Sequence, residues 1–191
     1  MAKREEDFLT YAVTLYFDDE TSGKIRSLTK KLSEVTENNY MIQNDVPPHL
    51  TLGMFHVAEA DAEKLKTLFS EFVEKVCAGV MCRKNFEIPF SRFESFLDKV
   101  IFIKLEKNEL LAGLNKLLHE LFVPHFEAGD NRNYLPENWY PHITLGFKLS
   151  HEQFEKGMDF LKGQPALSQG RGVRIGLACC NPYTPVCEIL I

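Results

Sequence analysis

Two histidine–threonine pairs are the residues best suited to catalysis in this chain. Residues 48–53 read Pro-His-Leu-Thr-Leu-Gly, and residues 141–146 read Pro-His-Ile-Thr-Leu-Gly. Five of the six positions are identical, and the sixth exchanges Leu for Ile. An imidazole titrates near pH 6.5 and serves as an acid or a base, and a threonine hydroxyl donates hydrogen bonds. The repeated pair therefore points to general acid–base catalysis.

The geometry of a β-strand decides where these side chains point. Both segments read as strands, in which alternate side chains share a face. His49 and Thr51 then lie on one face, roughly 6.5–7 Å apart, with apolar residues on the other face. The same holds for His142 and Thr144. Because the apolar neighbours enter the core, the polar pairs must face a cleft, and a two-fold arrangement of the repeats would bring all four together.

Such a constellation suits transfer at phosphorus. An in-line reaction needs a base on the attacking side and an acid on the leaving side, and two histidines fill both roles without a metal. Threonine hydroxyls donate to the non-bridging oxygens. A single His-x-Thr on a strand is usually an ordinary half-buried pair, but a packing accident has no reason to recur. We therefore expect catalysis from His49, Thr51, His142 and Thr144, with no metal and no other cofactor.

Strands and helices alternate around the two motifs, which indicates an α/β or α+β fold. Apolar runs predict strands, and apolar residues three and four apart predict helices. Ser150 and Gln153 form a capping box at the start of one helix. Strands are expected near 8–17, 49–57, 84–91, 99–105, 142–149, 171–180 and 184–190, and helices near 19–35, 59–78, 107–122 and 151–161, with a long polar loop at 124–141.

Composition excludes several classes of protein. The chain has 191 residues, of which 45% are hydrophobic and 26% charged, as in a globular domain with a real core. A net charge of −5 argues against binding to extended duplex nucleic acid. No apolar run suits a membrane helix, and no export signal precedes the first strand. We expect a cytoplasmic monomer whose five cysteines are reduced thiols.

The twin motif resembles the two-histidine (2H) phosphoesterase superfamily, which is defined by paired His-x-[Thr/Ser]-x motifs, and within it the branch of 2'-5' RNA ligases and 2',3'-cyclic phosphodiesterases. The opening strand, both motifs and residues 90–103 follow that family's order. The resemblance implies an α+β fold of two pseudo-symmetric lobes around a central active cleft, each a mainly antiparallel sheet with flanking helices. Residues 1–191 would form one bilobal domain, with repeats at about 8–80 and 97–165 and C-terminal strands at 170–191.

The resemblance also implies an activity. The favoured reaction is opening of a 2',3'-cyclic phosphate, or cleavage of a 2'-5' linkage, on a nucleotide or a short RNA end. One histidine would activate water, and the other would protonate the departing ribose oxygen. The alternatives are 2'-5' RNA ligation and a non-catalytic module that binds nucleotides or RNA ends. The acidic net charge disfavours ligation of long RNA more than it disfavours hydrolysis.

Several residues near the motifs are candidates to bind the substrate. Trp139 and Tyr140 closely precede His142, and Tyr11 or Thr14 on the first strand could reach the cleft. Phe90, Phe93 and Phe96 are candidates to stack a base, although core packing is the better reading for two of them. Cations that could hold a terminal phosphate are Arg92, Arg132, Arg171 and Lys104. His56 has the opposite strand parity to His49, so we expect it to lie outside the site.

Overall fold

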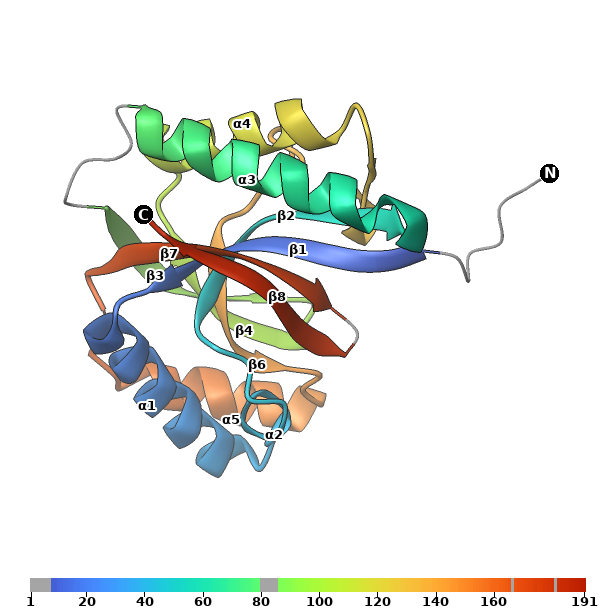
Figure 1. Ribbon diagram of the computed structural model, residues 1–191. Coiled ribbons are helices and arrows are strands. Elements are labelled where there is room, and N and C mark those ends of the chain that lie inside the picture. The colour runs from blue at the N-terminus through green and yellow to red at the C-terminus, as the bar shows by residue number, and fades with distance from the viewer. Residues whose placement is uncertain (1–7, 80–85, 166, 181) are drawn as a thin grey trace.

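The computed structural model describes residues 8–79, 86–165, 167–180 and 182–191 (Figure 1). Cys82 and residues 84–85 of one expected strand lie outside these ranges. The strands are β1 (Phe8–Phe17), β2 (His49–Ala58), β3 (Glu87–Phe96), β4 (Val100–Leu105), β5 (Glu127–Ala128), β6 (His142–Phe147), β7 (Gln169–Cys180) and β8 (Tyr183–Leu190). The helices are α1 (Asp19–Thr36), α2 (Tyr40–Gln43), α3 (Ala62–Ala78), α4 (Glu109–Phe122) and α5 (His151–Lys162).

These strands form one antiparallel sheet in the order β5-β2-β1-β7-β3-β4-β6, with β8 paired to β7. Strand β7 joins the two halves of the sheet, because its first residues pair with β3 and its later residues pair with β1. The helices lie in two groups on either side of the strands in Figure 1. The expected α+β class, with antiparallel sheet and flanking helices, is confirmed.

The chain runs twice through the same succession of elements. The first pass is β1-α1-β2-α3-β3 and the second is β4-α4-β6-α5-β7, if the short elements and the final strand β8 are left aside. The two passes exchange helices: α1 packs on α5 and β6, whereas α4 packs on α3 and β2. Each half of the sheet is therefore covered by one helix from each pass, and burying either apolar face requires both repeats.

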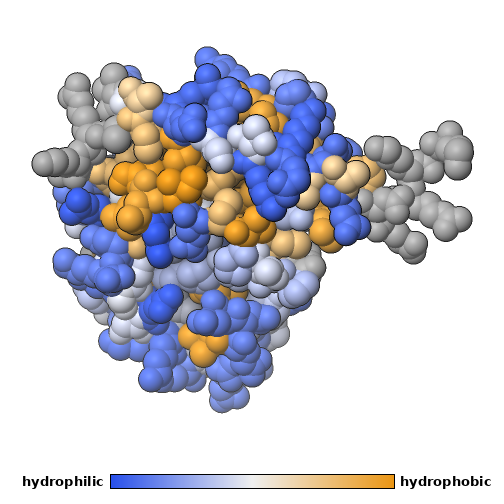
Figure 2. Space-filling model, viewed as in Figure 1, coloured by the Kyte–Doolittle hydropathy of each residue, from blue (hydrophilic) through white to orange (hydrophobic). Residues whose placement is uncertain are grey.

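Helix starts agree with the capping residues in the sequence. Asp18 accepts a hydrogen bond from the Thr21 amide, as expected from its place before α1. Ser150 and Gln153 form the expected capping box of α5. None of the helices that the structure describes is both long enough and apolar enough to cross a membrane. Figure 2 shows a face on which hydrophobic areas, one of them near the C-terminus, lie among hydrophilic side chains. Leu190, next to the last residue of the chain, is 74% exposed.

Each histidine motif contains a β-bulge, which the regular strand period assumed for the sequence does not include. Pairing slips by one residue between Thr51 and Gly53 in β2, and in the same way between Thr144 and Gly146 in β6. The extra residue is a leucine in both copies. After each bulge, the side chains at odd and even positions point to the opposite faces from before. A glycine therefore follows on the helix-facing side, where it lets a helical layer come close to the strand.

The two glycines provide a matched test of this packing. A Cβ atom at Gly53 would lie 2.9 Å from Cδ2 of Leu118 in α4, whereas at Gly146 the nearest atoms are at 3.4 Å. Gly53→Ala should therefore lower the free energy of unfolding by about 1–3 kcal/mol through overpacking. Gly146→Ala should change it by less than about 1 kcal/mol, since it also reduces the entropy of the unfolded chain. Urea denaturation of both variants measures the difference, and equal effects would contradict it.

Candidate active site

The two motifs lie at the centre of the molecule, on β2 and β6, which contact each other (Figure 1). In both strands the burial alternates as the strand period predicts. Leu50 and Leu52, like Ile143 and Leu145, are at most 1% exposed. His49, Thr51, His142 and Thr144 are half-buried. All four polar side chains thus remain partly open to solvent.

Both imidazoles are held by the same hydrogen bond. Nδ1 of His49 lies 2.7 Å from the carbonyl oxygen of Pro47, and Nδ1 of His142 lies 2.8 Å from that of Tyr140. A carbonyl oxygen only accepts, so Nδ1 carries the proton and donates it in each case. The neutral ring then has its lone pair on Nε2, which is the atom left for a ligand. Each histidine is thereby oriented to take up or release a proton at Nε2.

Burial lowers the pKa of both histidines and so favours their neutral forms. Desolvation lowers the pKa of His49 below its ordinary 6.5, against the effect of the Pro47 hydrogen bond. Desolvation also lowers the pKa of His142, and the charge of His49 lowers it further. The hydrogen bond to Tyr140 and the Asp130 carboxylate oppose this shift. Because a charge on His49 disfavours a charge on His142, protonation of both rings at once is unfavourable.

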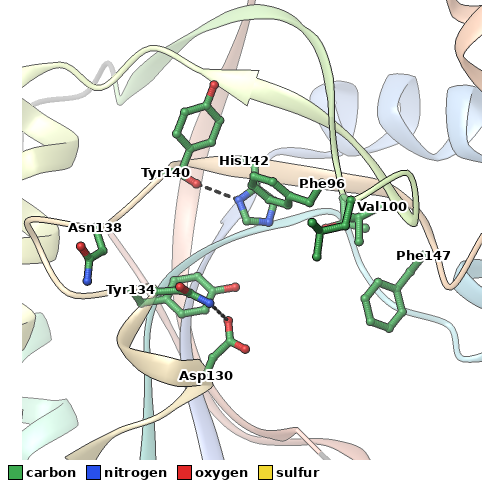
Figure 3. Close-up of a pocket in the computed structure, with 11 residues that line it drawn as sticks. Phe96, Val100, Asp130, Tyr134, Asn138, Tyr140, His142 and Phe147 are labelled. Atoms are coloured by element: carbon green, nitrogen blue, oxygen red, sulfur yellow. Dashed lines mark hydrogen bonds between the residues drawn. The ribbon is translucent and has the colours of Figure 1, made fainter.

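A cavity of about 450 Å³ opens beside His142 and Thr144 (Figure 3). Its other walls come from the β3–β4 hairpin, from the end of β6 and from the loop that precedes β6. Those residues are Phe96, Leu97, Val100, Asp130, Asn133, Tyr134, Asn138, Tyr140 and Phe147. His49 and Thr51 are not among the described residues that line it. Tyr134 connects the two motifs, because it lines the cavity and interacts with the Thr51 side chain.

Tyr134 is a residue that the sequence analysis missed. Burial raises the pKa of its phenol to about 12, and the Asp130 carboxylate acts in the same direction, against the effect of Thr51. The hydroxyl therefore stays protonated at neutral pH and is available as a donor. Asp130, Asn133, Asn138 and Phe147 were also not identified as site residues. The available signal was the long polar loop immediately before the second motif.

Trp139 is not placed to stack a base. Its side chain is only 4% exposed, and its Nε1 donates a 3.0 Å hydrogen bond to the carbonyl oxygen of Thr51. It therefore fastens the loop before β6 to strand β2. Tyr140, in contrast, lines the cavity as expected, and its ring carries the Lys104 ammonium 4.8 Å from its centroid.

Two other expected binding residues also lie elsewhere. Tyr11 pairs with Phe55 after the bulge, so it points to the face opposite Thr14 and Thr51 and packs against the core. Phe90 is buried edge to face against Phe17. Phe96 is the aromatic residue of that stretch that reaches the cavity, with its ring centroid 5.1 Å from that of His142.

The expected parity of His56 is wrong for the same reason. The bulge returns His56 to the face of His49 and Thr51, opposite Thr10 on β1. It nevertheless lies near the far end of β2, where its Nδ1 is 3.1 Å from the Thr10 hydroxyl. This position agrees with the prediction that His56 lies outside the site. The reason is its distance along the strand, not its parity.

The expected cations are distributed unevenly. Glu94 forms ion pairs with Arg92 and Lys104 and accepts a hydrogen bond from the Tyr140 hydroxyl. Burial alone would raise the pKa of Glu94, but these partners lower it overall. Arg92 and Lys104 line a second hollow on the other side of Tyr140. Arg132 is exposed and is not among the described residues around the cavity.

Comparisons with known proteins point to one family. A family model described as the 2'-5' RNA ligase superfamily matches residues 17–169. LigT from E. coli, in its apo form, is 15% identical with a TM-score of 0.54, and the match covers 96% of this chain and 98% of LigT. Usb1 from Kluyveromyces marxianus is 11% identical with a TM-score of 0.50, over 97% and 98%. These two likenesses show the fold, and no curated protein sequence matches the chain.

The lowered pKa values of three histidines predict how the stability of the protein depends on pH. Desolvation lowers the pKa of His49, His119 and His142. The unfolded chain therefore takes up their protons first as the pH falls. The stabilisation is complete above about pH 6.5 and is lost as the pH falls toward the folded-state pKa values. Urea denaturation between about pH 8 and pH 5 should show this decline.

His119→Gln removes one of these groups outside the cavity and should make the decline shallower. His125→Gln, at an exposed histidine, is the matched control and should leave it unchanged. A free energy of unfolding that stays constant over the whole interval in the unaltered protein would contradict the prediction.

Proposed function

The chain belongs to the 2'-5' RNA ligase superfamily, and on that basis we propose that it is a metal-independent phosphodiesterase. Its substrates are 2',3'-cyclic phosphates or 2'-5' linkages of nucleotides and short RNA ends. The observation that carries the proposal is the paired anchoring of His49 and His142. Each imidazole donates from Nδ1 to a carbonyl oxygen two residues earlier, which leaves Nε2 for the substrate.

The two imidazoles divide the proton transfers of hydrolysis between them. One accepts a proton from the attacking water, whose oxygen forms a new bond to phosphorus. The other donates a proton to the ribose oxygen as its bond to phosphorus breaks. The hydroxyls of Thr51 and Thr144 donate to the non-bridging oxygens, where charge accumulates in the transition state. The net reaction adds one water and leaves a phosphate ester and a free ribose hydroxyl.

The electrostatics of the site support this division. Two half-buried histidines with lowered pKa values repel a second proton, so the singly protonated pair is the favoured charged state. That state contains one base and one acid. A phosphodiester anion between the rings stabilises the proton, because a nearby opposite charge raises the pKa of an imidazole. Substrate binding therefore prepares the acid that the leaving oxygen needs.

The size and charge of the protein favour a small substrate. The cavity of about 450 Å³ lies within the range of small-ligand sites and accommodates one nucleotide rather than a duplex. The net charge of −5 disfavours long RNA. Structures of E. coli LigT contain phosphate or NADP+. Both are phosphate-bearing ligands, which is the class of ligand proposed for this chain.

Replacing either histidine tests the acid–base assignment. His49→Ala and His142→Ala should each lower kcat on 2',3'-cyclic nucleotides by roughly 10²–10⁴-fold, because each removes one proton carrier. The rate of the unaltered protein should depend on pH as a bell-shaped curve and should persist in EDTA. Hydrolysis is followed by chromatography of the products, and urea denaturation checks that each variant remains folded. Wild-type rates in both folded variants would exclude the assignment.

The threonines should contribute less and through the hydroxyl alone. Thr51→Ala and Thr144→Ala should lower kcat by about 10–100-fold, since each removes a donor to the phosphate. Thr51→Ser and Thr144→Ser keep that donor and should retain most of the rate.

Product mapping with 2'-5'-linked dinucleotides and with RNA fragments separates hydrolysis from ligation. Joined products without hydrolysis would contradict the phosphodiesterase proposal.

A further inference from the structure

The walls of the cavity beside His142 differ in chemistry. One wall is apolar and comes from β3, β4 and β6, with Phe96, Val100 and Phe147 as its main residues (Figure 3). Across the cavity lies the loop before β6, which presents Asp130 and Asn138 (Figure 3). Asn133 of the same loop also lines the cavity. A flat ring lying against the apolar wall would therefore turn its polar edge toward this loop.

The polar loop offers mostly hydrogen-bond acceptors. Nδ2 of Asn138 donates a 3.1 Å bond to the carbonyl oxygen of Arg132, and Nδ2 of Asn133 lies 3.5 Å from a carboxylate oxygen of Asp130. Each amide thus uses one of its two N–H groups inside the loop and keeps the other, so the acceptor oxygens of the three side chains outnumber the two remaining N–H donors. Asp130, as an ionised carboxylate, only accepts. The ligand edge that suits this wall consequently carries N–H donors.

Asp130 is held at the cavity by an unusual backbone turn. Asp130, Asn131 and Arg132 have φ angles of 50°, 52° and 65°, in the left-handed region that is unfavourable for residues with a Cβ atom. Among the ion pairs between described residues, Asp130 takes part in none. Its charge nevertheless acts on His142. A carboxylate so close to a site for an anion repels phosphate, so its favourable partner is a neutral donor on the ligand.

The nucleobases differ in how well the hydrogen-bonding groups on their edges match the acceptors of this loop. Guanine presents N1–H and the 2-amino group side by side, and together they match the two oxygens of a carboxylate. Adenine and cytosine pair an amino group with an acceptor nitrogen, and uracil has one N–H between two carbonyl oxygens. RNA-binding proteins read unpaired bases on these same edges. A carboxylate disfavours the acceptors in the last three bases.

We propose that the cavity is a base-selecting subsite in which the wall of Asp130, Asn133 and Asn138 prefers guanine. The inference rests on the proposed phosphodiesterase function and specifies its substrate as a guanosine with the reacting phosphate on its ribose. The base lies against Phe96 and Phe147, and the phosphate lies at His142 and Thr144. Asp130 is the specificity-determining residue.

The test compares kcat/KM for the 2',3'-cyclic phosphates of guanosine, inosine, adenosine, cytidine and uridine. The guanosine compound should exceed the uridine compound by at least about tenfold, within the range that one bidentate base contact supplies. Inosine lacks the 2-amino group but keeps N1–H, so it should fall between guanosine and adenosine. The same order should appear in calorimetric binding of the 3'-monophosphates, which does not depend on turnover.

Asp130→Asn is the informative variant, because asparagine tolerates the left-handed backbone while it replaces one acceptor oxygen with a donor. It should reduce the guanosine-to-uridine ratio to within about threefold of unity. Glu137→Gln is the matched control: it removes an exposed carboxylate of the same loop that is not among the described lining residues, and the ratio should be unchanged.

The outcomes separate this inference from the proposed function. Equal rates for all bases, or a guanine preference that survives Asp130→Asn, would overturn base selection while hydrolysis still stands. A uniform loss on every base in Asp130→Asn would also overturn it, since Asp130 would then act on the sugar or on His142. If no cyclic nucleotide is hydrolysed, the proposed function fails, but preferential binding of 3'-GMP that is lost in Asp130→Asn would still support the subsite.

Discussion

The hydrogen bond from each imidazole to the carbonyl oxygen two residues earlier is the constraint on which the site depends. It fixes the tautomer and the ring orientation together, because a carbonyl accepts and Nδ1 must donate. It also compensates part of the desolvation that lowers the pKa of His49 and of His142. The bond is local to each strand, so its duplication with the motif gives two equivalent proton carriers.

The bulge after each threonine connects that local geometry to the rest of the fold. It places a buried leucine and a glycine in succession on the helix side of β2 and of β6. The helices that cover these strands come from the opposite repeat, α4 over β2 and α1 over β6. A shift of a motif residue therefore changes the packing of a helix from the other repeat. At Gly53 the close approach of α4 leaves no room for a Cβ atom, which accounts for the glycine in that copy of the motif.

The loops that precede the two motif strands differ from each other. The loop before β2 contains the short helix α2, whereas the loop before β6 contains a left-handed turn and the buried Trp139. Trp139 ties that loop to β2, and Tyr134 brings it to Thr51. The groups proposed to react thus come from the duplicated strands, whereas the polar wall of the cavity comes from a single unduplicated loop.

The sequence alone determined most of the longer elements and the two histidine–threonine pairs that are proposed to react, because strand period, helix periodicity and capping residues are local properties, and the twin motif is visible without any fold. It did not indicate α2 or β5, and it placed β3 at 84–91 rather than at Glu87–Phe96. It predicted the half-buried His49 and His142 and the capping box at Ser150. It did not place Tyr11, Phe90 or Trp139, and it misassigned the parity of His56. In β2 the bulge moves the buried apolar positions from Leu50 and Leu52 to Phe55 and Val57, a change of parity that a regular strand period does not predict. Whether an aromatic ring faces a cavity or the core depends on segments far apart in the chain. Only the tertiary structure decided these positions, since the register of β1 on β2 and the packing of the loop before β6 on β2 are set by contacts between segments far apart in the chain.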